Sequence, residues 1–189
     1  IGGIAHLRQG HLPDGVDLLL DAKETYEPTE STGVFSYATH AAVVAVDPDS
    51  GAIELIDYAV VEDCGTMVNP MTLQGHVRGG VVNGIGSALM EHYHYDETGQ
   101  LQNVLFTDYL LPSIMESPDD IKIGHVVTPS PFTEYGIKGG GEGGRMGTPP
   151  ALAAAVEDAL RPLGITIDEL PISPNRLRRL IREAQAGGS

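Results

Sequence analysis

The feature that most constrains this chain is a run of glycines at residues 135–145, called here the glycine loop. Its sequence is YGIKGGGEGGR, and it holds six of the chain's 24 glycines. Glycine permits positive φ and removes side-chain walls, but each glycine costs conformational entropy on folding. So dense a run predicts close approach of another group to the backbone. Glu142 is its only acidic residue, which leaves three interpretations: a carboxylate held against a reactant, a phosphate cradle, or a flexible loop.

The glycine loop also satisfies the pattern G-x-G-x-x-G at residues 139–144. A dinucleotide site would need a strand directly before this pattern, a helix starting inside it and an acidic residue after a second strand. Here Pro131 and Gly136 precede the pattern, and the next helix is expected only from Pro149. A carboxylate inside the loop would also repel a pyrophosphate. The context therefore argues against a dinucleotide site.

Composition excludes several classes of protein. The net charge of -15 argues against a nucleic-acid partner, which would need clustered lysine and arginine. Cys64 is the single cysteine, so the sequence holds neither an internal disulfide nor a multi-cysteine iron–sulfur or zinc site. The sequence shows no apolar run long enough to span a membrane and no signal peptide, and a cytoplasmic location is expected. Because it begins at Ile1, we expect a split subunit or a fragment of a longer chain.

Apolar and turn residues alternate in a way that predicts strands. Residues 37–46 and 52–61 flank the turn 47–51 and are expected to form a β-hairpin, and residues 41–46, apolar throughout, are expected to be buried on both faces. Further strands are expected at about 16–26 and at 121–127. The predicted fold class is α+β, a mixed β-sheet with packed helices.

Three helices are expected, at about 70–92, from Pro149 to 160, and from Ser173 to about 184. The first contains several glycines, each of which costs roughly 1 kcal/mol relative to alanine. We infer that another backbone or a ligand approaches that helix closely. Residues 1–185 are expected to form one partial domain, and residues 186–189 a disordered tail.

Other reactive side chains have simpler interpretations. His92 and His94 stand two apart, but the sequence offers no further ligands at zinc spacing, so exposed or core histidines are expected. Cys64 lacks a base at a recognisable spacing and is interpreted as a turn residue beside Gly65. The arginines of the last helix are interpreted as a solvated or subunit-facing stripe. Glu142 differs from these, because the proton affinity of a carboxylate in a glycine-walled, low-dielectric pocket should rise, which suits a general base or acid.

Several strings in this order resemble one family, the molybdopterin-binding large subunit of the xanthine dehydrogenase, aldehyde oxidase and carbon monoxide dehydrogenase family. They are the segment 33–51, DCGTMVNP at 63–70, GHVRGGVVNGIG at 75–86, KGGGE at 138–142 and PPA at 149–151. The resemblance covers about residues 12–183 and indicates the C-terminal part of that subunit. It implies the fold of that subunit's C-terminal molybdopterin-binding domain.

The resemblance implies a mechanism for Glu142. In this family a glutamate of the K-G-x-G-E loop takes the proton from a molybdenum-bound hydroxyl group, whose oxygen then attacks a substrate carbon. The implied activity is an oxidoreductase that hydroxylates a C–H carbon of an aldehyde or an N-heterocycle-like substrate, using water. The metal is held by the pterin, so no protein ligand to it is expected. The cofactor is molybdopterin or its cytosine dinucleotide form.

The resemblance also implies cofactor contacts from two glycine-rich segments. The expected residues are Gly75, His76, Gly79, Gly80, Lys138, Gly139, Gly140 and Gly141. His76 stands where the family commonly has glutamine, whose amide donates and accepts at once. Its cofactor contact is therefore open, with Gln74 as a possible substitute.

The implied partners are the remainder of the large subunit, an iron–sulfur small subunit and an FAD medium subunit. Electrons would leave through those groups, and activity is expected only in the complex. Two alternatives stay open. One is a non-catalytic assembly subunit, and the other is a non-oxidative, hydratase-like use of the same fold. An intact loop around Glu142 favours catalysis over a scaffold.

Overall fold

A computed structural model describes residues 23–25, 27 and 33–187. By its contacts the chain divides into two compact units, residues 1–31 and 32–189, and the account below concerns the second. The strand expected at about 16–26 falls almost wholly outside the described residues. None of the helices in the described part is long and apolar enough to cross a membrane.

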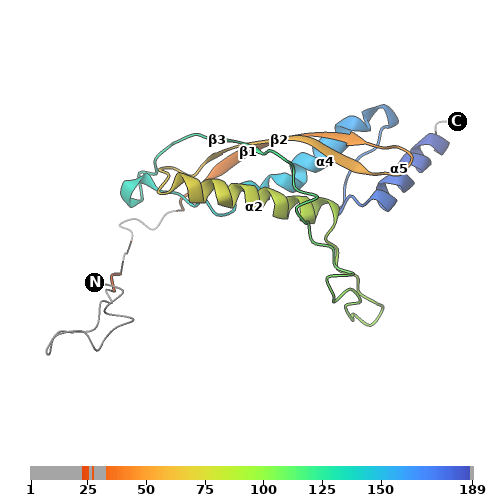
Figure 1. The fold of residues 1–189 in the computed structure, drawn as a ribbon, viewed down its shortest axis with the longest axis horizontal. Coiled ribbons are helices and arrows are strands. Elements are labelled where there is room, and N and C mark those ends of the chain that lie inside the picture. The colour runs from red at the N-terminus through yellow and green to blue at the C-terminus, as the bar shows by residue number, and fades with distance from the viewer. Residues whose placement is uncertain (1–22, 26, 28–32, 188–189) are drawn as a thin grey trace. The chain divides into compact units, whose positions relative to one another are not determined.

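A three-stranded mixed sheet forms the centre of this unit (Figure 1). Strand β1, Tyr37–Val46, pairs antiparallel with β2, Ile53–Asp63, and β2 pairs parallel with β3, Lys122–His125. The predicted hairpin is confirmed, as is the α+β class with its mixed sheet. At the turn, the Asp47 carboxylate accepts a hydrogen bond from the Asp49 backbone N–H at 2.9 Å.

Burial on both faces of residues 41–46 is a wrong prediction. Partly buried and exposed residues alternate along β1, because one face of the sheet packs against helices while side chains on the other face stay largely exposed. Val43 on that other face is 54% exposed. An all-apolar run therefore marks a strand here without proving that both of its faces are covered.

Four helices accompany the sheet: α2 (Pro70–Leu89), the single turn α3 (Gly143–Met146), α4 (Thr148–Ala159) and α5 (Pro174–Gly187). The predicted helices are confirmed with shifted ends. Helix α2 begins after Asn69, whose side chain accepts from the Thr72 N–H at 3.2 Å, and it ends at residue 89. Helix α5 continues to residue 187, into the stretch expected to be a disordered tail.

Two apolar clusters hold these layers together. The first joins the inner face of β2 to α2 and α4, and includes Tyr58, Val60, Val81 and Leu152. The second packs α4 and α5 below the hairpin turn and includes Val156 and Ile181. The clusters fix α2 and α4 against one face of the sheet, and the glycine loop passes between these helices and the strand ends.

Candidate functional site

The glycine loop is attached to the end of β2. Ile137 forms a bridge with Gly65, and the backbone N–H of Lys138 donates to the carbonyl of Cys64 at 2.9 Å. The loop then crosses to α3, where Glu142 is the residue before the first turn and its carbonyl accepts from the Arg145 N–H at 2.9 Å. Glu142 is thus carried on a short segment that is held at both ends.

Two cavities flank the loop. One of about 490 Å³ lies on the β1 side and is lined by Tyr37, His40, Gly139, Glu142 and other loop residues. The second, of about 380 Å³, lies on the α2 side. It is lined by residues 64, 66–69, 72, 73, 76, 137, 138, 140 and 141. The segment 138–143 therefore separates two hollows, and the backbone of residue 141 lines both.

The Glu142 side chain is exposed, which corrects the expectation of a carboxylate enclosed in a low-dielectric pocket. A Cβ added to Gly139 or Gly141 would meet no atom within 4 Å. The described residues thus supply the bare wall that was expected beside the carboxylate, while the side chain itself stays exposed.

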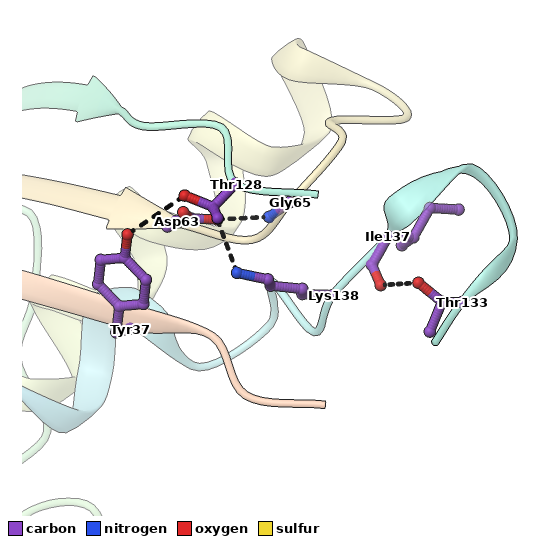
Figure 2. A network of polar contacts seen from close by, with 7 residues as sticks. All are labelled: Tyr37, Asp63, Gly65, Thr128, Thr133, Ile137 and Lys138. Carbon is purple, nitrogen blue, oxygen red and sulfur yellow. Dashed lines mark hydrogen bonds and ion pairs between the residues drawn. The ribbon is translucent and has the colours of Figure 1, made fainter. Parts of the chain in front are cut away.

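Lys138 has a structural role that the sequence analysis did not foresee. Its side chain is 10% exposed, and Nζ lies 3.3 Å from Oδ1 of Asp63, which is fully buried at the end of β2 (Figure 2). Nζ also lies 5.4 Å from the ring centre of Tyr37. These contacts turn the ammonium group into the protein, where it holds the loop to the sheet. The predicted cofactor contact of Lys138 stays a prediction.

Asp63 is kept ionised by its surroundings. Burial by itself would raise its pKa, but hydrogen bonds from Thr128 and from the backbone of Gly65 outweigh burial and hold the pKa well below its usual range. The Gly65 N–H lies 2.8 Å from Oδ1, and Tyr37 contacts Thr128 at the other side of the group (Figure 2). Asp63 is therefore a negatively charged partner for Lys138 at neutral pH.

The remaining loop glycines divide into two kinds. A Cβ on Gly140 would lie 2.8 Å from Leu73 and 3.3 Å from Cβ of Cys64, so its lack of a side chain is explained by packing within the chain. Gly139 and Gly141 face open space instead. Only these two leave room for a bound group, so the three predicted contacts are not equivalent.

The glycines of α2 divide in the same way. A Cβ on Gly80 would lie 2.9 Å from the Arg145 nitrogen, and one on Gly84 would lie 2.5 Å from Cβ of Thr148. The close backbone approach inferred from the sequence is thus observed, and it explains Gly80 without a cofactor. Gly75 and Gly79 face open space.

His76 is exposed and lines the α2-side cavity together with residues 138, 140 and 141. The structure therefore places His76 and the loop residues that were predicted to contact the cofactor around one cavity. Gly75 and Gly79 lie on the same helix but outside the lining of either cavity. Their predicted cofactor contacts stay predictions.

Glu62 is a buried carboxyl group beside the glycine loop that the sequence analysis missed. Its side chain is 2% exposed, and burial raises its pKa. A Cβ on Gly143 would lie 2.3 Å from its Oε2, and Nδ1 of His125 lies 3.5 Å from its Oε1. A buried carboxyl group thus lies directly beneath the residue after Glu142. Glu62 lies in a strand where acidic and apolar residues are mixed, so the sequence did not show that this carboxyl group is buried.

His40 was also missed, although a polar residue inside the run YATHAAVVAV was a usable signal. Its ring contacts the glycine loop from β1: Nε2 lies 2.9 Å from the carbonyl oxygen of Gly143. The other candidates keep their simpler interpretations. His92 and His94 are exposed and contact each other at 3.2 Å, and Arg176 pairs with acidic residues 168 and 169 at the surface.

Comparisons with known proteins identify the family of this chain. The family model described as "Molybdopterin cofactor-binding domain" matches residues 8–118. The nicotine 6-hydroxylase large subunit of Paenarthrobacter nicotinovorans is 42% identical over 149 residues, 79% of this chain and 18% of that protein. The carbon monoxide dehydrogenase large chain of Hydrogenophaga pseudoflava is 32% identical over 171 residues, 90% of this chain and 21% of that protein.

Among solved structures, quinoline 2-oxidoreductase from Pseudomonas putida 86 matches with a TM-score of 0.80 and 43% identity. The match covers 96% of this chain and 23% of that one. The chain spans about a fifth of the length of the curated relatives named here. The chain therefore belongs to the molybdopterin cofactor-binding domain family, and corresponds to part of the molybdopterin-binding large subunit of the xanthine dehydrogenase, aldehyde oxidase and carbon monoxide dehydrogenase family.

Proposed function

We propose that this chain forms one wall of the active site of a molybdenum hydroxylase, with Glu142 as the general base. The observation that supports this most is the placement of Glu142. It lies on a short segment between two hollows, held by Lys138 on one side and by α3 on the other. A segment so held, with glycines on its open side, suits a carboxylate that must meet a bound reactant in a fixed position.

The described residues fit a cofactor of this kind. Gly139 and Gly141 leave the loop backbone open to a bound group, and His76 lines the α2-side cavity. Gly75 and Gly79 present a bare helix surface next to His76. When bound, the molybdenum cofactor would supply an oxygen derived from water and would accept two electrons.

Glu142 would take a proton from the reacting oxygen as that oxygen bonds to the substrate carbon. A positioned general base contributes about 10²–10⁴-fold to the rate. The carboxylate is exposed in this chain, so its enclosure during the reaction must come from the bound reactants and the remainder of the subunit. Exclusion of water there would strengthen the attraction between the carboxylate and the proton it receives.

We propose an N-heteroaromatic substrate that is hydroxylated at a ring C–H carbon. Two proteins more than 40% identical to this chain are named for nicotine and quinoline, both of which contain nitrogen heteroaromatic rings. The relative named for carbon monoxide is 32% identical. A carbon next to ring nitrogen is electron-poor, which suits attack by an oxygen nucleophile.

Electron transfer would require redox groups held by residues outside this sequence, on other domains or subunits. A single cysteine cannot ligate an iron–sulfur cluster, for which four cysteine ligands are usual. We propose an iron–sulfur small subunit and an FAD medium subunit as partners, together with the remainder of the large subunit. The cofactor would be molybdopterin or its cytosine dinucleotide form.

The reaction class is tested by isotope labelling of the purified complex. Each turnover converts a C–H bond and one water into a C–OH group, two electrons and two protons. With quinoline or nicotine as probe in H₂¹⁸O, the product should carry ¹⁸O, and an added electron acceptor should be reduced in equal amount. Product that carries oxygen from O₂, or hydration without reduction of the acceptor, would overturn the proposal.

A further inference from the structure

His40 lies on the inner side of β1 and contacts the segment that follows Glu142. Its Nε2 lies 2.9 Å from the Gly143 carbonyl oxygen, and its Nδ1 lies 2.7 Å from the Tyr58 hydroxyl. A Cβ on Gly147 would lie 2.1 Å from Cδ2 of His40, so the ring packs directly on the backbone there. The ring is therefore fixed from three directions.

The contacts continue beyond the ring. The Tyr58 hydroxyl lies 2.8 Å from Oγ1 of Thr148, and the Thr148 hydroxyl donates to the Gly144 carbonyl at 2.8 Å. Tyr58 and Thr148 are almost wholly buried. A continuous line of polar contacts thus joins the carbonyls of two consecutive residues, Gly143 and Gly144, just after Glu142.

The groups in this line of polar contacts have too few hydrogens to make every contact a hydrogen bond. Its four contacts each need one proton, and both ends are carbonyl oxygens that only accept. The hydroxyls of Tyr58 and Thr148 supply one proton each, and a neutral His40 supplies a third. Burial lowers the pKa of His40, with the Gly143 hydrogen bond acting in the opposite direction, so the ring is neutral at neutral pH. One contact therefore has no proton.

The choice of tautomer decides which contact lacks its proton. With the proton on Nδ1, the lone pair of Nε2 would face the Gly143 oxygen at 2.9 Å, and neither group can turn away. With the proton on Nε2, the shortage falls among the contacts of the Tyr58 and Thr148 hydroxyls, whose hydrogens can each turn toward either of two neighbours. The second arrangement avoids a fixed repulsion, so the Nε2–H tautomer is favoured.

We propose that His40 is a positioning residue for Glu142: its Nε2–H holds the Gly143 carbonyl and so fixes the backbone after the base. The loop is held before the base by Lys138 on Asp63. Together the two contacts place the carboxylate relative to both cavities. This inference rests on the proposed role of Glu142, and it assigns His40 a positioning role rather than a catalytic one.

The test compares two amide replacements in the assembled holoenzyme. In His40→Gln the amide reaches the position of Nε2 and can still donate to Gly143, whereas in His40→Asn the shorter side chain reaches only the position of Nδ1. We expect kcat to fall by roughly 10- to 10²-fold in His40→Asn, as for a misplacement of about 1 Å. KM and molybdenum content should not change, and His40→Gln should restore most of kcat.

A readout independent of turnover is hydrogen–deuterium exchange of the peptide that covers residues 139–147. Exchange there should be faster in His40→Asn than in His40→Gln, while exchange of α2 stays the same. His92→Asn, which changes an exposed histidine outside both cavities, serves as the matched control. Equal kcat, or equal exchange, in the two His40 variants would overturn the inference.

Tyr58→Phe separates positioning from proton relay. Without the phenol hydroxyl, Thr148 can still donate to Gly144 and His40 to Gly143, so kcat should stay close to that of the wild type. If the line of contacts carried protons to or from Glu142, Tyr58→Phe would be as damaging as His40→Asn, and positioning would be the wrong account.

The parallel variant Glu142→Gln distinguishes failure of the positioning role of His40 from failure of the base role of Glu142. If it abolishes activity while His40→Asn does not change kcat, the positioning role fails and the base assignment stands. If Glu142→Gln itself leaves kcat unchanged, the proposed function fails first, whatever His40 does.

Discussion

Asp63 shows how single side chains set the position of the glycine loop. It is fully buried, accepts a 2.8 Å hydrogen bond from Gly65 and pairs with Lys138 at 3.3 Å. Its pKa lies well below the usual range because hydrogen bonds outweigh the effect of burial. A carboxyl group of this kind binds fewer protons in the folded state than in the unfolded state, so its contribution to stability depends on pH.

The sign of that dependence follows from the lowered pKa. The contribution of Asp63 is complete above the unfolded pKa of about 3.9 and is lost as pH falls through the folded value. We expect Asp63→Asn to unfold at lower urea concentration than the wild type at pH 7, with a smaller further loss between about pH 4 and pH 3. Urea unfolding curves at each pH measure this.

Asp119→Asn, at an exposed aspartate, is the matched control for that experiment. It should leave the difference in urea midpoint between the two pH values as it is in the wild type. Asp63→Asn curves that keep the full wild-type difference would contradict the account of this residue.

At the residue scale, the sequence predicts what depends on neighbouring residues, but not contacts between residues that lie far apart in the chain. Glu142 and the loop around it were predicted from a local run of residues. The pairing of Lys138 with Asp63, and of His40 with Gly143, joins residues 75 and 103 positions apart. Such contacts depend on how β1, β2 and the loop meet in space. The exposure of Glu142 within this chain depends on the same arrangement, so local composition could not predict it.

At the scale of elements, α2 uses its glycines for two purposes. Gly80 and Gly84 lie where the backbone of α3 and the start of α4 approach the helix, and a Cβ there would be 2.5–2.9 Å from the neighbouring atoms. Gly75 and Gly79 have no such neighbours. The sequence predicted close approach to this helix, but it could not tell which glycines faced α3 and α4.

Alanine substitutions along α2 should therefore have opposite effects. Gly84→Ala overpacks the contact with Thr148 and should destabilise the fold by about 1–3 kcal/mol. Gly79→Ala meets open space and should stabilise the helix by about 1 kcal/mol, because alanine is the better helix former. Thermal unfolding measures both. A stabilised Gly84→Ala would contradict the packing described here.

Gly79→Ala also tests the proposed contact between Gly79 and the cofactor. If Gly79 contacts the cofactor as proposed, this variant should retain less molybdenum in the assembled complex even though its fold is more stable. Full molybdenum content in Gly79→Ala would remove this residue from the proposed contacts without affecting the assignment of Glu142.

At the scale of the whole molecule, the described residues leave many large apolar side chains exposed. The outer face of the sheet exposes Val43 and Ile56 at 54% and 55%, and Phe106 and Met115 are exposed at 82% and 84%. Exposed apolar side chains in such number are typical of surfaces that meet other protein. Glu142, which lines one of the two cavities beside the glycine loop, is likewise exposed.

The isolated chain should therefore retain molybdenum in less than stoichiometric amount and show no hydroxylase activity. Co-expression with the remainder of a large subunit and the two electron-transfer subunits should raise the molybdenum content to stoichiometric. Metal analysis after purification decides the point. Stoichiometric molybdenum in the chain alone would show that it binds the cofactor without those partners.

The central claim is that Glu142 is the general base, and Glu142→Gln in the assembled holoenzyme tests it most directly. Glutamine keeps the size of the side chain but cannot accept the proton. Molybdenum content should match the wild type while kcat falls by about 10²–10⁴-fold. Glu134→Gln, at an exposed glutamate upstream, should keep the wild-type rate. A Glu142→Gln enzyme with full molybdenum and an unchanged rate would contradict the claim.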